Sequence, residues 1–331
     1  MKFVVSYPQT NWDYVQFRLN RIVRGEDRSN DVFKGSMGGK IQLFEHDGNL
    51  GGIRSLGEFY RDKPFGTQYV EGEGLYFLTG LPCPEDGTPA NEHIVRLNDH
   101  GQIDLEIRSP LFSQLRSIRR TENGLLVTSS GVDAILEVDF EGNVLWSWWA
   151  TEHGYSRAHG GGTRAVDKTI DHRLKCYPGR LQTTHMNSVI IDPYDPSKII
   201  TVLFYQGALA RIDRQTLKTE VVFEGLSGPH HIRPHSKGYL LSNSRKGQVI
   251  LFDRNFKPIE TIQATSRYFP VKWVQDAIET PFGTHLIADC NTFRLRDRSA
   301  SGREKTFKTH LPNRIFQIEA VSDSFTLPAA I

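Results

Sequence analysis

The sequence predicts an all-β protein, a six-bladed β-propeller with long insertions on one face. The main observation is a pair of short apolar strands that recurs six times along the 331 residues. A unit repeated about every 40 residues or more is typical of propellers and solenoids. In most copies the second strand ends in an acidic or amide residue and is followed by a tight turn. Because propeller blades share one closed ring, we expect a single domain over residues 1–331.

Composition agrees with a packed β protein and excludes several other classes. Hydrophobic residues make up 38% of the chain and aromatic residues 11%, which argues against disorder. No run approaches the roughly 18–20 apolar residues of a membrane helix. The apolar stretch within residues 1–8 is too short for the core of a signal peptide. The net charge is only +2, so nothing global indicates nucleic acid.

The three cysteines, Cys83, Cys176 and Cys290, are an odd number at unrelated spacings. They make neither a disulfide framework nor a CxxC metal motif. We therefore predict a cytoplasmic protein with no membrane or nucleic-acid partner, and we leave its oligomeric state open.

Each repeat is predicted to supply four strands, named a to d from the axis outward. Runs of about four apolar or β-branched residues predict the b strands, because such runs are typical of strands buried on both faces. The predicted b strands are 3–6, 76–79, 125–128, 199–202, 239–242 and 285–288. The predicted c strands are 40–45, 93–98, 134–139, 208–213, 248–253 and 314–319. Hairpin turns follow five of the c strands, and segments such as 144–149 and 220–223 supply the d strands.

Strand a precedes each b strand and lines the axis. Five such strands are visible, at 66–70, 115–118, 184–189, 230–233 and 274–277. The first blade lacks one, because residues 3–6 already form its b strand. Residues 324–328 could supply the missing strand and close the ring, or could form strand d of the last blade. Five complete blades and a partial one is therefore an open alternative.

Long insertions are predicted at one mouth of the channel, where the b–c and d–a connections lie. They are residues 8–38, 80–92, 150–183 and 290–312. Functional residues concentrate in loops that a rigid scaffold positions.

Two of these insertions are also basic. Segment 291–312 has six basic and two acidic residues, and segment 151–183 has six basic and three acidic residues. A basic mouth concentrates an anion such as a sulfate, phosphate or carboxylate, with Arg294 and Arg296 as candidate ligands. Few aromatic residues lie between these charges, so stacking on bases is not expected.

The predicted axis is lined by polar side chains that an apolar channel would not need. The position seven residues before the glycine of four b strands is occupied by Thr67, Ser117, His231 and Asp276. His185 and Asn187 are the approximate equivalents in blade four. Other candidates on the same strands are Gln68, Arg116, His230 and Gln275. Because buried polar groups cost about 1–3 kcal/mol each when unpaired, this cluster is either a satisfied network or a ligand site.

Three interpretations of this cluster stay open. His185, His231 and Asp276 could bind a divalent metal such as Zn²⁺ or Fe²⁺. A histidine could act as nucleophile or general base while Asn187, Gln275 and Arg116 polarise a substrate. The lining could also be structural and satisfied by water. Strand alternation predicts that His230 and His231 do not both point inward, and the register favours His231.

Two motifs resemble the strand starts of bacterial arylsulfotransferase-like propellers. Thr184-His185-Met186-Asn187-Ser188-Val189 resembles that family's His-x-Asn-x-Val start, and Gly228-Pro229-His230-His231-Ile232-Arg233 resembles its His-Asp-x-Arg start. The segment 125–149 is also similar to that family in its order of apolar strand, turn and second strand. The resemblance implies a propeller enzyme in which His185, Asn187 and His230 act at the axis, with His230 accepting the sulfate. The chain departs from the family at Phe204–Tyr205, where the family has an arginine, and at His231, where it has an aspartate.

We therefore predict an enzyme, either a transferase or a metal-dependent enzyme, that acts on a small anionic or polar substrate at the axis. The predicted catalytic residues are His185, Asn187, His230 and His231. The predicted substrate-binding residues are Gln68, Arg116, Gln275, Arg294 and Arg296. The alternative is a non-catalytic scaffold that binds a protein or peptide at its basic mouth.

Overall fold

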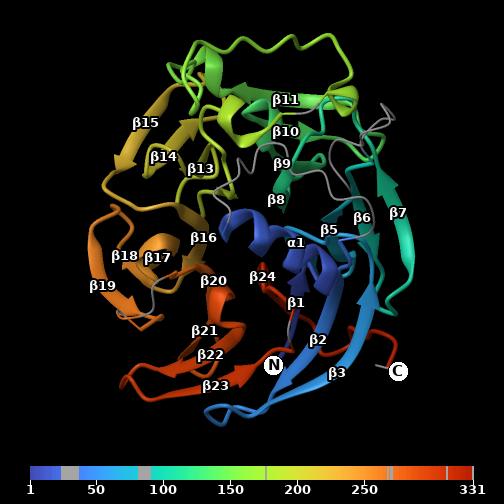
Figure 1. Ribbon diagram of the computed structural model, residues 1–331, viewed down its shortest axis with the longest axis vertical. Coiled ribbons are helices and arrows are strands. Elements are labelled where there is room, and N and C mark those ends of the chain that lie inside the picture. Colours follow the sequence, from blue (N-terminus) through green and yellow to red (C-terminus); the bar gives the residue numbers. More distant parts are fainter. Residues whose placement is uncertain are drawn as a thin grey trace.

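The computed structural model describes residues 1–329 except 24–36, 81–90, 176, 267, 269–270 and 311. Its strands form six antiparallel sheets of four strands each. Figure 1 shows these sheets arranged as blades around a common axis. The predicted six-bladed β-propeller is therefore confirmed. Among the described helices, none is both long and apolar enough to span a membrane.

The blades follow one another along the chain, and each runs from the axis outward. Blade one is β24 (Gln317–Val321), β1 (Lys2–Tyr7), β2 (Lys40–His46) and β3 (Ile53–Tyr60). Blade two is β4 (Thr67–Val70), β5 (Gly74–Thr79), β6 (His93–Leu97) and β7 (Ile103–Ile107). Blade three is β8 (Leu115–Arg120), β9 (Leu125–Ser129), β10 (Ala134–Val138) and β11 (Val144–Trp149).

The remaining blades repeat this order. Blade four is β12 (Val189–Ile191), β13 (Lys198–Leu203), β14 (Ala208–Asp213) and β15 (Thr219–Phe223). Blade five is β16 (Pro229–His235), β17 (Gly238–Asn243), β18 (Gln248–Phe252) and β19 (Pro258–Gln263). Blade six is β20 (Val274–Glu279), β21 (Thr284–Asp289), β22 (Arg294–Ser299) and β23 (Glu304–Lys308).

The ring is closed by β24, which pairs antiparallel with β1 from Lys2↔Val321 to Ser6↔Gln317. The prediction of a c strand at 314–319 is therefore wrong, because this segment supplies strand a of blade one. The prediction of an insertion at 290–312 is also wrong, since it contains β22 and β23. Residues 324–328 form neither of the two strands proposed for them. The error arose because β22 is rich in arginine and does not resemble the other apolar strands.

The b–c and d–a connections share one face of the ring, called here the upper face. Its largest described insertion joins β11 to β12 and contains the short 3-10 helices η3 (Ala150–Glu152), η4 (His172–Leu174) and η5 (Gly179–Leu181). The α-helix α1 (Trp12–Val23) belongs to the β1–β2 connection, and Figure 1 shows it crossing the middle of the ring. The predicted insertions 8–38 and 80–92 lie partly outside the described residues.

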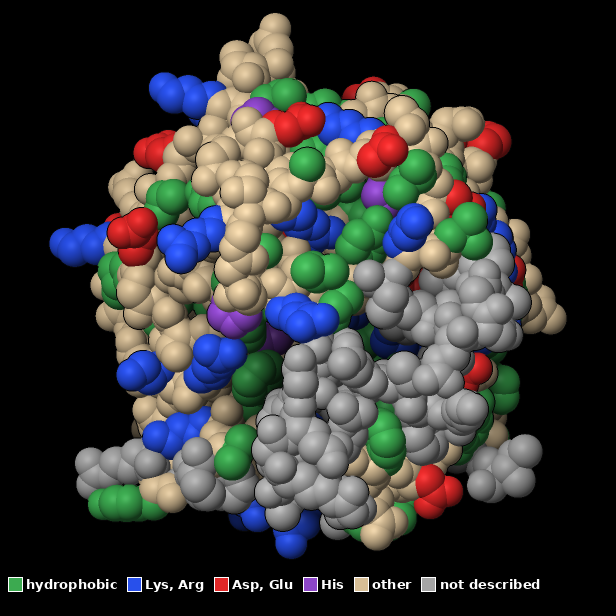
Figure 2. All heavy atoms as spheres, turned by 45° about the horizontal axis from the view of Figure 1, so that its top comes forward, with side chains coloured by type: hydrophobic (Ala, Val, Ile, Leu, Met, Phe, Trp, Pro, Cys, Tyr) green, Lys and Arg blue, Asp and Glu red, His purple; other side chains and the backbone are tan. Residues whose placement is uncertain are grey.

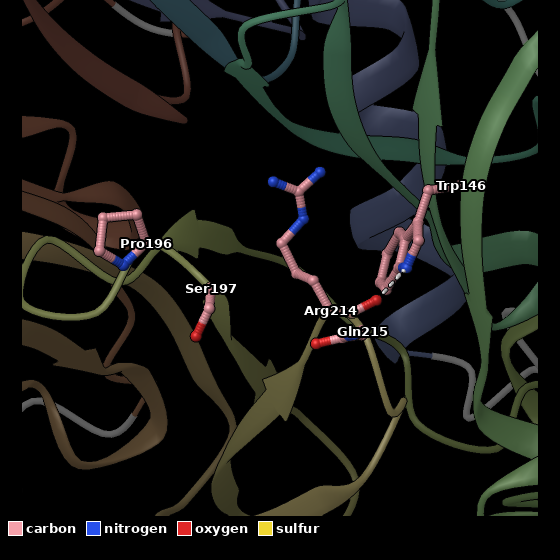
Figure 3. A pocket seen from close by; sticks show the side chains of 5 residues that line it. All are labelled: Trp146, Pro196, Ser197, Arg214 and Gln215. Carbon is pink, nitrogen blue, oxygen red and sulfur yellow. Dashed lines mark hydrogen bonds between the residues drawn. The ribbon is translucent and has the colours of Figure 1, made fainter.

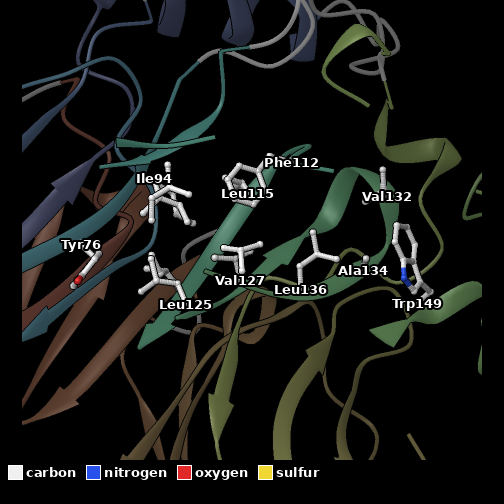
Figure 4. Packing of buried hydrophobic residues seen from close by; sticks show 14 residues of the cluster. Tyr76, Ile94, Phe112, Leu115, Leu125, Val127, Val132, Ala134, Leu136 and Trp149 are labelled. Carbon is white, nitrogen blue, oxygen red and sulfur yellow. The ribbon is translucent and has the colours of Figure 1, made fainter. Parts of the chain in front are cut away.

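Apolar side chains between neighbouring blades hold the ring together. Figure 4 shows one such cluster, between blades two and three. It includes Tyr76, Phe112, Leu125 and Leu136, each no more than 1% exposed. Side chains of this size contribute about 1.5–3 kcal/mol each when fully buried. This packing fixes the inner strands and therefore the polar groups at the axis.

Candidate active site

The inner strands of blades three, five and six are irregular at their upper ends. Their pairing register shifts between Leu115 and Ile118, between Pro229 and Ile232, and between Val274 and Asp276. Such β-bulges interrupt side-chain alternation and re-aim side chains, and they are frequent beside active sites.

The bulge in β16 brings both of its adjacent histidines into contact with other blades. His230 packs against Phe204 of blade four and Trp273 before blade six, while His231 contacts Phe316 before blade one. Both histidines are at most 5% exposed. The bulge interrupts the alternation on which the prediction of a single inward-pointing histidine was based.

His185 is held in place by a carboxylate from the neighbouring blade. Asp133 accepts hydrogen bonds from the backbone N–H groups of Thr183, Thr184 and His185 at 2.8, 2.8 and 3.3 Å. His185 has a backbone φ of 50°, a left-handed conformation that costs a non-glycine residue about 1–3 kcal/mol and recurs at functional sites. The predicted inner strand begins only at Val189, so His185 and Asn187 belong to a shaped turn that precedes it.

A pair of glutamines sets the tautomer of His185. The amide of Gln182 donates to Oε1 of Gln114 at 2.8 Å and to the carbonyl of Tyr177 at 3.0 Å. Its Oε1 is therefore free to accept a hydrogen bond, and Nδ1 of His185 donates to it. Since the ring nitrogen Nδ1 carries the hydrogen, Nε2 of the neutral ring presents a lone pair. That atom has no hydrogen-bond partner within the described residues.

A serine sets the tautomer of His230 in the same way. The hydroxyl of Ser244 donates to the carbonyl of Val274 at 2.5 Å, so its oxygen acts as an acceptor toward Nδ1 of His230 at 2.7 Å. The carbonyl of Gly228 lies 3.1 Å from the same nitrogen. Both partners require a hydrogen on Nδ1, which leaves the lone pair on Nε2. His185 and His230 thus present the same nitrogen in the same state.

The two imidazoles share an aromatic neighbour, Phe204. Ring centroids of Phe204 lie 5.3 Å from His185 and 5.2 Å from His230, both edge-on. Tyr205 contacts His185 at 5.4 Å and stacks on His159 at 4.0 Å. Phe204 and Tyr205 therefore occupy the center of the site at the point where the resembling family carries an arginine.

Burial keeps both histidines neutral. It lowers the pKa of His185 to about 3, and the charges of Arg116, His159 and Arg245 act in the same direction. Burial and the neighbouring His231 also hold the pKa of His230 well below its ordinary value. A neutral imidazole with an unpaired Nε2 can take a proton or attack an electrophile.

Two arginines near these histidines have no carboxylate partner in the described part of the chain. The guanidinium of Arg116 lies over the ring of Phe65 at 4.6 Å and donates only to the carbonyl of Leu115 at 3.2 Å. Arg245 lies over Phe204 at 5.0 Å. Figure 2 shows Lys and Arg side chains gathered beside histidines on this side of the molecule. Both guanidinium groups are therefore able to bind an anion at the axis.

The register positions found in the sequence join neighbouring blades. Oγ of Ser117 accepts from the N–H of Val189 at 3.1 Å, and Nδ1 of His231 donates to the carbonyl of Gln275 at 2.8 Å. Asp276 accepts from the N–H of Ile318 at 2.9 Å. The candidates Arg116, His230 and Gln275 come one residue before these positions, and Asn187 comes one residue before Ser188.

Asp276 belongs to a buried ion-pair network. Its carboxylate accepts hydrogen bonds from Nε and Nη2 of Arg233 at 3.1 and 2.6 Å. Nη1 of Arg233 donates to the carboxylate of Glu319 at 2.7 Å. Burial raises the pKa of Asp276, but Arg233 outweighs this effect and keeps it below its usual value.

The proposed metal ligands His185, His231 and Asp276 do not come together. No group of three histidine, cysteine or acidic residues in the described chain could hold a metal ion. Both oxygens of Asp276 are already engaged with Arg233, and Nδ1 of His231 is engaged with the carbonyl of Gln275.

Three of the predicted substrate-binding residues have structural partners or lie away from the axis. Gln68 accepts a hydrogen bond from the N–H of Arg120 and so joins blades two and three. Arg296 pairs with Asp289 at 2.8 Å and Glu304 at 2.5 Å inside blade six. Arg294 begins β22, the third strand from the axis. The charges of segment 291–312 therefore belong to outer strands and not to the mouth.

Three buried polar groups at the axis lack partners among the described residues: Nδ2 of Asn187, Nε2 of Gln275 and Nε2 of His231. All three residues are at most 4% exposed. Trp273 donates from Nε1 to Oε1 of Gln275 at 2.7 Å. Because an indole nitrogen can only donate, the other end of the Gln275 amide is its NH₂ group.

Two cavities lie elsewhere on the molecule. Figure 3 shows a pocket of about 300 Å³ between blades three and four, lined by Trp146, Pro196, Ser197, Arg214 and Gln215. A second cavity, of about 490 Å³, lies beside the ion-pair network of Arg233 and is lined in part by His235 and Glu279. Neither contains His185 or His230.

Sequence reasoning missed the residues that orient the histidines. Gln182, Ser244 and Asp133 were not singled out, nor was the aromatic neighbour Trp273. Ser244 and Ser130 both open a turn after a b strand, and each donates to a backbone carbonyl at or just before the next inner strand, of Val274 and Met186 respectively. Aligning the repeats beyond their b strands would have exposed this equivalence.

Comparison with known proteins identifies the fold and no family. No protein-family model matches the chain, and no curated protein matches it significantly. A protein of unknown function from Bacteroides caccae superposes with a TM-score of 0.58 at 11% identity, covering 96% of this chain and 98% of that one.

Two further structures superpose at similarly low identity. A chain of a nidogen/laminin complex has a TM-score of 0.56 at 10% identity, covering 96% of this chain and 98% of that one. A putative 6-phosphogluconolactonase from Bacteroides fragilis has a TM-score of 0.54 at 10% identity, covering 96% of each. At these identities the likeness establishes a shared fold, which enzymes and binding proteins both use.

Proposed function

We propose that this protein is an enzyme that transforms a small anionic molecule at the upper end of the propeller axis. The observation that carries the proposal is the matched state of His185 and His230. Each comes from a different blade, donates from Nδ1 to a fixed acceptor, and keeps an Nε2 lone pair that is unpaired among the described residues. A histidine serving only to fill a core would not need its tautomer fixed by two further residues.

The chain's own groups supply the remaining roles. Arg116 binds the anion, because its guanidinium lies close enough to lower the pKa of both histidines and has no carboxylate partner in the described chain. Arg245 adds a second positive charge at the rim. His230 acts as nucleophile or general base, and His185 acts on the same reacting group as proton acceptor. Ser244 and Gln182 are positioning residues that keep the two lone pairs available.

The similarity to arylsulfotransferase-like propellers supports this assignment at three positions. His185, Asn187 and His230 match the residues that act at the axis in that family, and here the rings of His185 and His230 both contact Phe204. The family's arginine is absent at Phe204–Tyr205, and Arg116 and Arg245 would supply the positive charge instead. Group transfer to His230 is therefore compatible with the residues present, as is hydrolysis by base catalysis.

The proposal is tested with a panel of chromogenic sulfate, phosphate and carboxylate esters together with lactones. We expect the wild-type protein to turn over at least one class, and His230→Asn and His185→Asn to lose at least about 100-fold in kcat/KM, since acid–base groups contribute about 10²–10⁴-fold. His100→Asn, in an exposed turn, is the matched control and should keep full activity. Turnover that survives both substitutions would refute the assignment, as would a wild-type protein inactive on every class.

A further inference from the structure

The unpaired groups beneath the two histidines form a second recognition element. Asn187 lies in the turn before the inner strand of blade four, and His231 and Gln275 belong to the inner strands of blades five and six. Their inner strands are joined there, because Ser188 accepts from the N–H of Ile232 at 3.3 Å and His231 donates to the carbonyl of Gln275 at 2.8 Å. Within the described residues, each of the three retains a buried polar atom with no partner.

The hydrogen-bonding character of two of these atoms is fixed by their other contacts. The Nε2 group of Gln275 can only donate, because Trp273 occupies its oxygen at 2.7 Å. The Nε2 atom of His231 can only accept in the neutral ring, because Nδ1 carries the hydrogen that goes to the carbonyl of Gln275. Burial lowers the pKa of His231 and keeps the ring neutral. The amide of Asn187 is able to offer either character.

A ligand group between Gln275 and His231 must therefore accept one hydrogen bond and donate another. A carboxylate or sulfate oxygen satisfies only the first requirement, and a methylene satisfies neither. A hydroxyl group satisfies both. Arg116 comes one residue before Ser117 in the inner strand of blade three. Because its guanidinium has no carboxylate partner within the described residues, it would bind an anionic group of the same molecule.

We infer that the axial site binds a hydroxylated organic anion, with the anionic group on Arg116 and a hydroxyl between Gln275 and His231. This inference rests on the proposed function, because it assumes that the anion binds at Arg116. Leaving a buried donor and a buried acceptor unpaired is unfavourable. A site built to hydrogen-bond a hydroxyl discriminates strongly against an analogue that lacks it.

Calorimetric titration with matched pairs of small acids tests the inference. The probes are glycolate against acetate and gluconate against hexanoate, with the uncharged polyol sorbitol as a further control. We expect at least one hydroxy acid to bind the wild-type protein about tenfold or more tightly than its match, and sorbitol to bind no more tightly than the non-hydroxylated acids. Equal affinity within both pairs, or no binding by any probe, would overturn the inference.

Variants locate the hydroxyl contact and separate it from catalysis. Gln275→Met should abolish the preference for the hydroxy acid, whereas Gln102→Met, in an exposed turn of blade two, should keep it. A preference that survives Gln275→Met would overturn the inference. His230→Asn should keep the binding preference and lose turnover. Hydroxy-acid binding by a wild-type protein that turns over no substrate would support the inference and refute the proposed enzymatic function.

Discussion

The Nδ1 atom of His230 lies 2.7 Å from Oγ of Ser244, the residue that opens the turn after the next strand of the same blade. The serine hydroxyl is itself committed to the carbonyl of Val274 in blade six. One side chain thus links two blades and fixes which nitrogen of the histidine carries its hydrogen. The structure therefore ties the chemistry of the site to the assembly of the ring.

Removing this serine should weaken the tautomer preference of His230. In Ser244→Ala the Nδ1–H form loses one of its two acceptors among the described residues and keeps the carbonyl of Gly228, 3.1 Å away, so the population of the Nε2–H form should rise. Nitrogen-15 NMR of the imidazoles should show Nε2 of His230 unprotonated in the wild-type protein and partly protonated in the variant. Ser242→Ala removes a buried hydroxyl of the preceding strand that has no hydrogen-bond partner in the described part of the chain, and it should leave the His230 signals unchanged. Identical spectra for Ser244→Ala and wild type would contradict this account.

Acid should destabilise the protein through His185. Its pKa is about 3 in the folded state and about 6.5 in an unfolded chain, so below pH 6.5 the unfolded state binds the additional proton. Stability therefore falls as the pH decreases across this window. Replacing His185 with glutamine should reduce the slope by about 1.4 kcal/mol per pH unit, measured by urea unfolding from pH 7 to pH 4.5. His100→Gln should retain the wild-type slope; an unchanged slope in His185→Gln would show that this imidazole is not neutral in the fold.

Asp276 should prove essential to stability. Asp276→Ala leaves Arg233 buried with a single carboxylate, Glu319, and frees the N–H of Ile318. Breaking a buried ion pair typically costs about 3–5 kcal/mol, so denaturant unfolding should show a loss of that size. The exposed pair between Arg211 and Glu220, at 2.9 Å, supplies the control, because Glu220→Gln should cost less than about 1 kcal/mol. Equal effects of the two substitutions would refute the structural role.

Ring closure predicts a sharp boundary for truncation. A chain ending at residue 314 lacks β24 and exposes the inner edge of β1, so it should lose cooperative unfolding and aggregate. A chain ending at Pro328 keeps every strand and should melt like the full-length protein. Thermal unfolding monitored by circular dichroism distinguishes these outcomes. A cooperative transition at the wild-type temperature in the shorter chain would contradict the role given to β24.

Most of the fold could be predicted from the sequence, because each blade repeats a buried strand followed by a strand ending in a turn. The b strands such as Leu125–Ser129 were recognised by their continuous apolar character. Blade six was misread, since β22 carries Arg294, Arg296 and Arg298, whose charges resemble those of a loop. Only three-dimensional pairing shows that Arg296 is neutralised by Asp289 and Glu304.

The candidate site was predicted in part. His185, Asn187, His230, Gln275 and Arg116 of the proposed site were all candidates from the sequence, because polar residues in predicted inner strands differ from their apolar neighbours. The register argument assumed regular strands and selected positions such as Ser117 and Asp276, which bond to neighbouring blades. These positions come one residue after Arg116 and Gln275. A bulge shifts the inward face by one residue, and no local pattern at residues 229–232 announces it. The partners that fix each tautomer come from other blades and depend on long-range packing.

Pairing of β24 with β1 has a consequence for synthesis on the ribosome. Strand β1 is synthesised first and β24, its neighbour toward the axis, is synthesised last. The pair between Lys2 and Val321 can therefore form only at the end of translation. Throughout translation the nascent chain therefore carries an open strand edge, the kind of surface to which other chains add. A chaperone that covers such edges until termination would raise the yield of the protein more than one that acts only after release.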